Sequence, residues 1–406
     1  MTAPIRDSSA AFLLKGYAWL PDGRRRSSDG VVETRLMGRP AFGIGGPAAT
    51  RFFYDERHVR RSGAIPGFVQ STLFGHGSVH TLDSLAHRRR KAMYLALFTP
   101  DRIGDLVAHT GAAWDAAAPG WAGREVSLFQ ESARVLADGV ARWVGLPRDY
   151  ELGHDCVAMV DGFATAGPRH WRARIARGRQ EERLAGLVTD LRRQGPTGGD
   201  TALYVVAHHR DDDGHLLTPE TAAVELLNVV RPTIAVSWFV AFAAHALHRW
   251  PGHSDQLRDG DPAYAEAFAH EVRRFYPFAP FVGGRAAGDV EFAGHSIPTG
   301  ALVLLDLYGQ NHDPALWKDP YRFHPERFLG PDAEAALDPY TLVPQGGGDP
   351  ATGHRCPGEP NTVALLSDLA VRMARLDYDV PSQDLDIPLD RIPTRPRDGM
   401  RVIPRP

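Results

Sequence analysis

Cys356 lies in a glycine-rich segment, residues 341–365 (TLVPQGGGDPATGHRCPGEPNTVAL), that leads into a helical stretch. With Pro357 in the first turn, the segment places a cysteine at the start of a helix, where amide groups and the helix dipole favour a thiolate. An anionic sulfur in that position can ligate iron. Residues without a Cβ let the backbone approach a flat macrocycle closely, and the segment contains Gly346, Gly347, Gly348, Gly353 and Gly358.

Two other interpretations of this cysteine stay open from its local sequence. A lone cysteine is more often a buried structural thiol, and Cys156 offers a disulfide partner for Cys356. Two cysteines are too few for a disulfide scaffold, and this low number suits a reducing compartment. The sequence assigns no role to Cys156.

Arg231 is the second residue whose position predicts chemistry. It stands in a helix predicted over residues 218–250, with Thr218 as its cap, Pro219 as its first residue and Pro251 after its end. At 1.5 Å per residue the helix is about 48 Å long, enough to form a wall of the core. The face that carries Arg231 is otherwise apolar, with Val224, Leu227, Ala235 and Trp238. A buried guanidinium needs an anion, and this is either a carboxylate of the protein or a ligand.

The elements that position these residues are mainly helical. Residues 1–70 contain strand-like pieces (VVETRLMG, AFGIGG), whereas residues 86–250 carry apolar side chains at helical spacing. A helix, a strand-and-loop stretch and a final helix follow. Pro232 removes a backbone donor and frees the carbonyl of Asn228, which predicts a kink in the long helix. We expect one domain, 1–406, with a helix-rich core and a small β-rich flank.

Composition excludes some classes of partner. The net charge is −3, so there is no electrostatic case for binding nucleic acid or an anionic membrane. No apolar run reaches the roughly 20 residues of a spanning helix, and the N-terminal stretch lacks the basic and apolar regions of a signal peptide. The sequence therefore predicts a cytoplasmic protein without a membrane anchor.

Two further motifs precede the cysteine loop. Glu271 and Arg274 are spaced to share one helix face, and the sequence PERF follows at residues 325–328. A surface salt bridge explains either motif alone. An ExxR helix, then PERF, then a glycine loop with HRCPG resembles the cytochrome P450 superfamily. The resemblance implies the P450 fold, haem b with Cys356 as its axial iron ligand, and a supporting network of Glu271, Arg274 and Arg327.

One branch of that superfamily, the bacterial fatty-acid peroxygenases and decarboxylases, is similar over residues 38–381. The stretches that carry this similarity are NVVRPTIAVSWF, EVRRFYPFAPFVGG, LLDLYGQNHDPALW, GPRHW and QGGGDPATGHRCPGE. Most P450s have an acid and an alcohol in the long helix to protonate iron-bound dioxygen, whereas this chain has Arg231 and Pro232. The resemblance implies hydrogen peroxide as co-substrate, a fatty acid as substrate and no need for a redox partner.

The missing acid–base group can arrive with the substrate. A fatty acid carboxylate held by Arg231 would lie over the iron and could move the proton that peroxide cleavage requires. Only Cα and Cβ would then be within reach, which predicts 2- or 3-hydroxylation, or decarboxylation to a terminal alkene. A reductase-dependent monooxygenase of another substrate and a non-enzymatic haem or lipid sensor are the alternatives.

The resemblance also assigns the surroundings of the haem. His80 and Phe74 align with the distal pocket, where histidine accompanies alkene formation and glutamine accompanies hydroxylation; a structural histidine is the other interpretation of His80. Predicted partners of the haem propionates are His87, Arg90, Lys91, Arg285 and His354. Predicted substrate-binding residues besides Arg231 are Leu73, Phe74, Ala166, Phe281 and Val282, each of which can equally be plain core.

Overall fold

The computed structural model describes residues 6–195 and 198–406, and most of them are helical. The helices are α1 (Ser9–Lys15), α2 (Trp19–Arg26), α3 (Pro47–Tyr54), α4 (Gly67–Val69), α5 (Ser84–Leu97), α6 (Pro100–Ala117), α7 (Leu128–Val144), α8 (Leu152–Asp161), α9 (Pro168–Arg193), α10 (Ala202–Ala207), α11 (Pro219–Ile234), α12 (Val236–Arg249), α13 (Gly252–Asp259), α14 (Pro262–Phe275), α15 (Leu307–Asn311), α16 (Ala333–Ala336) and α17 (Glu359–Arg375).

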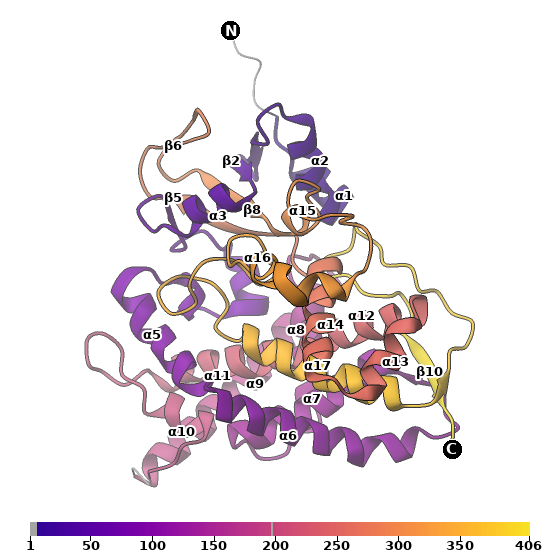
Figure 1. Ribbon diagram of the computed structural model, residues 1–406. Coiled ribbons are helices and arrows are strands. Elements are labelled where there is room, and N and C mark those ends of the chain that lie inside the picture. The colour runs from indigo at the N-terminus through magenta and orange to yellow at the C-terminus, as the bar shows by residue number, and fades with distance from the viewer. Residues whose placement is uncertain (1–5, 196–197) are drawn as a thin grey trace.

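The strands lie in two places, a small flank at one end of the molecule and a second group with β10 near the C-terminus (Figure 1). They are β1 (Val32–Leu36), β2 (Arg39–Ile44), β3 (Val59–Arg60), β4 (Val126–Ser127), β5 (Phe281–Ala286), β6 (Val290–Phe292), β7 (His295–Ile297), β8 (Leu302–Asp306), β9 (Tyr378–Asp379) and β10 (Arg401–Pro404). The largest sheet has the order β1-β2-β8-β5-β3, in which β2 and β8 are parallel and the other neighbours antiparallel. The predicted helix-rich core with a small β-rich flank is confirmed.

Local sequence signals explain where the central helices begin. The Thr218 hydroxyl accepts a hydrogen bond from the Thr221 amide at 3.2 Å, as expected of the cap before α11. Asp261 caps α14 in the same way, bonding to the Ala263 amide at 3.0 Å. Helix α9 starts at Pro168, because Gly167 and Pro168 provide a helix start.

The long helix is interrupted rather than kinked at the proline. Helix α11 ends at Ile234 and α12 starts at Val236, so the break lies at Ala235, three residues after Pro232. Together the two helices are long and apolar enough to cross a membrane. However, 94% of the residues in their most apolar 18-residue stretch are buried inside the protein. They form the wall of the core that the sequence predicted, with α9 packed along α11 and α7 along α12.

The predicted network of one acid and two arginines lies beside this wall. Arg274 donates from Nε and Nη2 to the two carboxylate oxygens of Glu271, at 2.7 and 2.8 Å. Arg327 adds a bond from Nε at 3.1 Å, and the His324 amide a further one at 2.8 Å. Glu271 is fully buried. The helix α14 is thereby joined to the PERF turn under the glycine loop.

Removal of the Glu271 charge is expected to destabilise the protein by about 3 kcal/mol, because two guanidinium groups would lose their buried counterion. Urea unfolding of Glu271→Gln measures this loss. Glu266→Gln on the same helix is the control, since the Glu266 side chain is 63% exposed and should leave the midpoint unchanged. Equal midpoints for the two variants would contradict the prediction.

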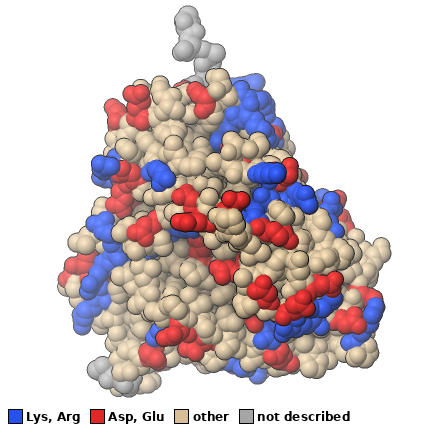
Figure 2. Space-filling view, in the orientation of Figure 1, with Lys and Arg blue, Asp and Glu red and all other residues tan. Residues whose placement is uncertain are grey.

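The surface carries both signs of charge. Figure 2 shows acidic and basic side chains interspersed on the visible face, without a broad field of one sign. This distribution agrees with the net charge of −3 and gives no support for a nucleic-acid partner on that face.

Candidate active site

The cysteine loop comes directly before α17. Cys356 lies two residues before Gly358, the residue that caps the helix, so α17 begins later than predicted and Pro357 precedes it. The Cys356 amide donates to the Gln345 carbonyl at 3.3 Å, and the Gln345 side chain donates from Nε2 to the sulfur at 3.8 Å. Burial and then the Glu359 carboxylate raise the thiol pKa, while the Gly358 amide and Lys91 oppose them.

Both cysteines are free thiols, so the disulfide interpretation is wrong. Cys156 is fully buried on α8 among apolar residues, and burial raises its pKa to about 12. Cys156 therefore has the surroundings of an inert core residue, whereas Cys356 lies in a polar loop with a hydrogen-bond donor directed at its sulfur.

The glycines before the cysteine allow the loop to pack tightly. Gly346 has a φ of 95°, and a Cβ there would lie 2.4 Å from the Tyr54 hydroxyl. A Cβ on Gly347 would lie 2.4 Å from the Thr50 methyl group and 2.9 Å from the carbonyl of Pro339. Only glycine fits these two positions, but the close neighbours are atoms of the protein itself. The predicted approach of the backbone to a macrocycle therefore stays a prediction.

The edge of the site gathers imidazole and cationic groups. The rings of His87 and His354 stack with their centroids 3.8 Å apart. Nδ1 of His87 is buried without a hydrogen-bond partner, whereas Nε2 of His354 lies 3.5 Å from Oδ1 of Asp83 and 4.0 Å from Oε1 of Glu56. Burial is the main cause that lowers the pKa of His87 to about 3 and that of His354 to about 4. Lys91 lies beside them and donates to the carbonyls of Gly353 and Arg355.

Arg285 and Arg90 differ in how they relate to this edge. Nε of Arg285 is buried without a partner, which leaves it available to an acidic ligand. The guanidinium of Arg90 bonds instead to the carboxylates of Asp211 and Glu225 and to the Gly77 carbonyl, so its donors are already engaged. Buried Arg61 was not predicted; it donates to the Gly283 carbonyl at 2.7 Å.

These residues fit haem b. A thiol stands in a glycine-rich loop, and Nδ1 of His87 and Nε of Arg285 are buried without partners, where two haem carboxylates would need donors. The exposure of Pro232 is a further observation beside Arg231. Within residues 222–247 of the two helices, Pro232 is the only exposed residue, so the wall reaches accessible surface directly after Arg231.

Three predicted distal residues lie together. The rings of Phe74 and His80 are 4.6 Å apart, and the Arg231 guanidinium carbon is 5.9 Å from the Phe74 ring centre. Burial and then the charge of Arg231 lower the pKa of His80 well below its usual value, so the imidazole is neutral. Nδ1 of His80 is buried without a partner.

Arg231 has no acid partner within the described parts of the chain. It is 6% exposed, its Nη2 donates to the Asn228 amide oxygen at 3.1 Å, and its Nε has no partner. Burial, followed by the charge of Arg177, lowers its pKa. The sequence left open whether a carboxylate of the protein pairs with Arg231. In the described residues no carboxylate does so.

The remaining predicted substrate-binding residues are dispersed. Leu73 belongs to the main core, and its carbonyl accepts from Arg177 at 2.6 Å. Phe281 packs against Phe12, with ring centres 5.2 Å apart, and Val282 against the second core cluster. Ala166 is exposed between α8 and α9.

Sequence reasoning missed Gln345, Asn228 and Glu225. Gln345 was printed in the QGGG motif, but its contact with the sulfur depends on how the loop folds. Asn228 and Glu225 stand three and six residues before Arg231 in the same helix. The signal that could have identified Asn228 was its position three residues before Arg231, which puts two polar side chains on the same face of an apolar helix.

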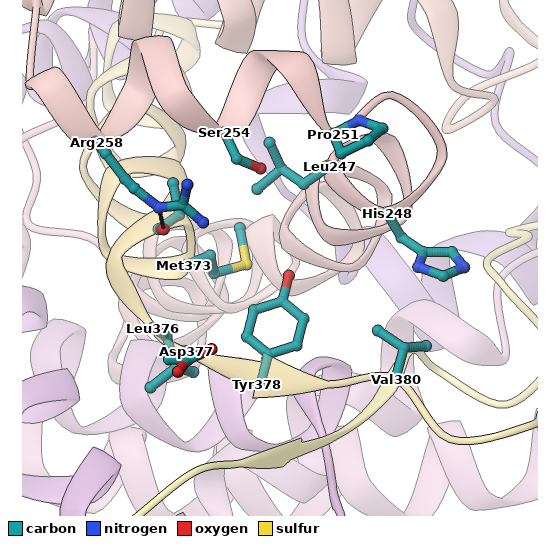
Figure 3. A pocket seen from close by; sticks show the side chains of 11 residues that line it. Leu247, His248, Pro251, Ser254, Arg258, Met373, Leu376, Asp377, Tyr378 and Val380 are labelled. Atoms are coloured by element: carbon teal, nitrogen blue, oxygen red, sulfur yellow. Dashed lines mark hydrogen bonds between the residues drawn. The ribbon is translucent and has the colours of Figure 1, made fainter.

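A surface groove of about 200 Å³ lies elsewhere (Figure 3). Arg258, Met373, Leu376 and Tyr378 are among the residues that line it. The groove lies at the C-terminal end of α17, which carries Met373, about 25 Å along that helix from its start after Cys356. The groove is therefore not part of the candidate active site.

Comparisons with known proteins agree with this geometry. The family described as Cytochrome P450 matches residues 261–360. The chain is 36% identical over 132 residues to Cytochrome P450 76C4 of Arabidopsis thaliana, a match that spans 30% of this chain but only 25% of that protein. It is 25% identical to Abscisic acid 8'-hydroxylase 3 of Oryza sativa subsp. indica over 84% of this chain and 72% of that protein.

Solved structures match over almost the whole chain. A variant of Cytochrome P450SP alpha (CYP152B1) has a TM-score of 0.93 and 38% identity, covering 98% of both chains. A variant of cytochrome P450 OleT in complex with arachidonic acid has a TM-score of 0.93 and 34% identity, covering 99% of this chain and 98% of that chain. Cytochrome P450EX alpha (CYP152N1) with myristic acid gives 0.93 and 35%, covering 99% of both.

The fold and the cysteine loop define a haem-thiolate oxidoreductase. The chain belongs to the cytochrome P450 family, in the branch of the CYP152 fatty-acid peroxygenases and decarboxylases.

The two cysteines should respond differently to replacement. Cys356→Ala is expected to lose the absorption spectrum of thiolate-ligated haem, because no other sulfur lies in the glycine loop. Cys156→Ala is the matched control and should keep that spectrum, since its thiol lies in the apolar core. Absorption spectra of the reduced, carbon monoxide-bound proteins make the comparison. A normal spectrum for Cys356→Ala would contradict the assignment of the ligand.

Proposed function

We propose that this protein uses hydrogen peroxide to oxidise long-chain fatty acids at Cα or Cβ, with haem b bound through Cys356. The observation that carries the proposal is Arg231, a buried guanidinium that has no acid partner in the described residues and whose Nε is buried without a hydrogen-bond partner. Such a group is costly unless an anion reaches it. A fatty acid supplies a carboxylate together with an apolar tail that the surrounding core can accept. The similar structures that contain arachidonic and myristic acid support this choice.

Haem b, once bound, supplies the oxidising chemistry, because thiolate donation to the iron favours cleavage of the O–O bond of peroxide. Arg231 would bind the substrate carboxylate in a charge-assisted pair and hold Cα and Cβ near the reacting centre. The bound carboxylate could take and return the proton that must move between the peroxide oxygens. Pro232 leaves no hydroxyl beside Arg231 to do this. His87, Lys91, Arg285 and His354 would bind the haem propionates.

Two outcomes balance chemically. Hydroxylation converts the acid and one peroxide into a hydroxy acid and water. Decarboxylation converts them into a terminal alkene, carbon dioxide and two waters. A neutral His80 beside Phe74 can hydrogen-bond near the substrate carboxylate, and we propose that alkene formation accompanies hydroxylation for this reason. We further propose a cytoplasmic enzyme that needs no redox partner.

A reductase-dependent monooxygenase is the second candidate. The similarity to the plant enzyme Abscisic acid 8'-hydroxylase 3 over 84% of the chain favours it. This candidate predicts turnover with dioxygen and a reductase but little with peroxide. A haem or lipid sensor would instead show a spectral change with fatty acid and no product.

Arg231→Ala separates these possibilities. We expect peroxide-driven kcat/KM for myristic acid to fall by about a hundredfold or more, because the carboxylate anchor is lost. The melting temperature should stay the same or rise, since the variant removes a buried charge without an acid partner.

The methyl ester of myristic acid is the matched control on the substrate side. Wild-type protein should turn it over as poorly as Arg231→Ala turns over the acid, because the ester lacks the charge. Full activity of Arg231→Ala with peroxide, or no turnover of any fatty acid by wild-type protein, would exclude the proposed function.

His80→Gln should raise the ratio of hydroxy acid to alkene, since the amide replaces the imidazole next to the substrate carboxylate. Product analysis by mass spectrometry measures the ratio. His76 lies in the same loop but is exposed, so His76→Gln is the control and should leave the ratio unchanged. An unchanged ratio in His80→Gln would assign His80 a structural role.

A further inference from the structure

We propose that Glu225 is a positioning residue that sets the relative place of Arg231 and His80, and this inference rests on the proposed function of those two side chains. Glu225 touches neither of them directly. It is hydrogen-bonded to the backbone beside His80 and to the side chain that bonds Arg231. Its carboxylate is thus the point at which two distant segments of the chain meet.

One oxygen of Glu225 holds the segment of His80. Oε1 accepts a hydrogen bond from the Val79 amide at 2.9 Å. Val79 opens the short 3-10 helix Val79–Thr81 that carries His80. This bond joins the segment to α11, although the two residues stand 146 positions apart in the sequence. A shift of the carboxylate would therefore shift the imidazole.

The other oxygen connects to Arg231 through Asn228. Oε2 accepts from the Asn228 amide nitrogen at 3.4 Å, and the same nitrogen donates to the Phe74 carbonyl at 2.9 Å. The amide oxygen of Asn228 then accepts from Arg231 at 3.1 Å. With its nitrogen engaged by Glu225 and Phe74, the amide can present only its oxygen to the guanidinium.

Arg90 and Tyr94 of α5 complete the surroundings of the carboxylate. Arg90 donates from Nη1 to Oε1, and the Tyr94 hydroxyl donates to Oε2 at 2.6 Å. Burial raises the pKa of Glu225, while Arg90 and then Tyr94 oppose that rise. The buried acid is thereby matched by a cation of its own, so it does not neutralise Arg231.

The segment between Phe74 and Val79 needs such anchors. Gly75 and Gly77 have φ angles of 81° and 71°, in the region that favours glycine, and glycine gives the chain its greatest conformational freedom. Arg90 Nη1 also contacts the Gly77 carbonyl at 3.3 Å. The hydrogen bonds of the Glu225 network therefore hold in place a loop whose glycines make it flexible.

The test uses Glu225→Gln in the haem-loaded, full-length protein. The amide keeps the size of the side chain but removes its charge and one acceptor. We expect the dissociation constant for myristic acid, measured from the change in haem absorption, to rise about tenfold or more. Peroxide-driven kcat/KM should fall by up to about a hundredfold, and the ratio of hydroxy acid to alkene should change.

Asp306→Asn is the matched control. Asp306 is also a fully buried acid paired with an arginine, since Arg24 donates to it at 2.9 Å. Its substitution should lower thermal stability in the same way but keep the myristic acid dissociation constant and the product ratio within about twofold. A structural role for Glu225 predicts that both variants behave alike, and that result would overturn the proposal.

A second variant covers loss of folding. If Glu225→Gln does not retain haem, Arg90→Lys keeps a cation beside Glu225 and removes the multiple bonds of the guanidinium. Weaker myristic acid binding with unchanged haem content is expected, and unchanged binding would overturn the proposal. The binding measurement also separates this inference from the proposed function. If wild-type protein fails to turn over fatty acids but still binds them, Glu225→Gln must weaken that binding for the inference to stand.

Discussion

A buried guanidinium without an acid partner is the constraint on which the rest of this structure depends. Arg231 lies in the apolar wall formed by α11 and α12, where a charge costs free energy unless an anion approaches it. Pro232, the next residue, is exposed. The proposed fatty acid substrate meets this constraint, because its carboxylate would pair with Arg231.

The two sides of the proposed haem site handle charge in opposite ways. On the side of Cys356, a hydrogen-bond donor from Gln345 points at the sulfur, and buried nitrogens of His87 and Arg285 have no partner in the protein. On the side of Arg231, the described residues place a cation and an imidazole, and no carboxylate bonds to the guanidinium. In the proposed function, the substrate carboxylate carries the proton.

The sequence predicted those parts of the site that local motifs encode. The cysteine loop, the start of α11 at Thr218 and the Glu271 network follow from spacing and from the family resemblance. The role of Arg90 could not be read in this way, because its partners Asp211 and Glu225 stand 121 and 135 residues away. A run of four basic residues shows only that cations are present, and the tertiary fold decides which of them faces the core.

Asn228 explains how an ionised acid and an unpaired arginine coexist on one helix. Glu225 and Arg231 are separated by less than two helical turns. A direct ion pair between them, or a second acid in place of Asn228, would neutralise the guanidinium before substrate arrives. A neutral amide between them transmits position through its hydrogen bonds but carries no charge. Arg90 of α5 forms an ion pair with Glu225 and so neutralises its charge. The network thus connects Arg231 to Glu225 and to α5 without placing a carboxylate in contact with the guanidinium.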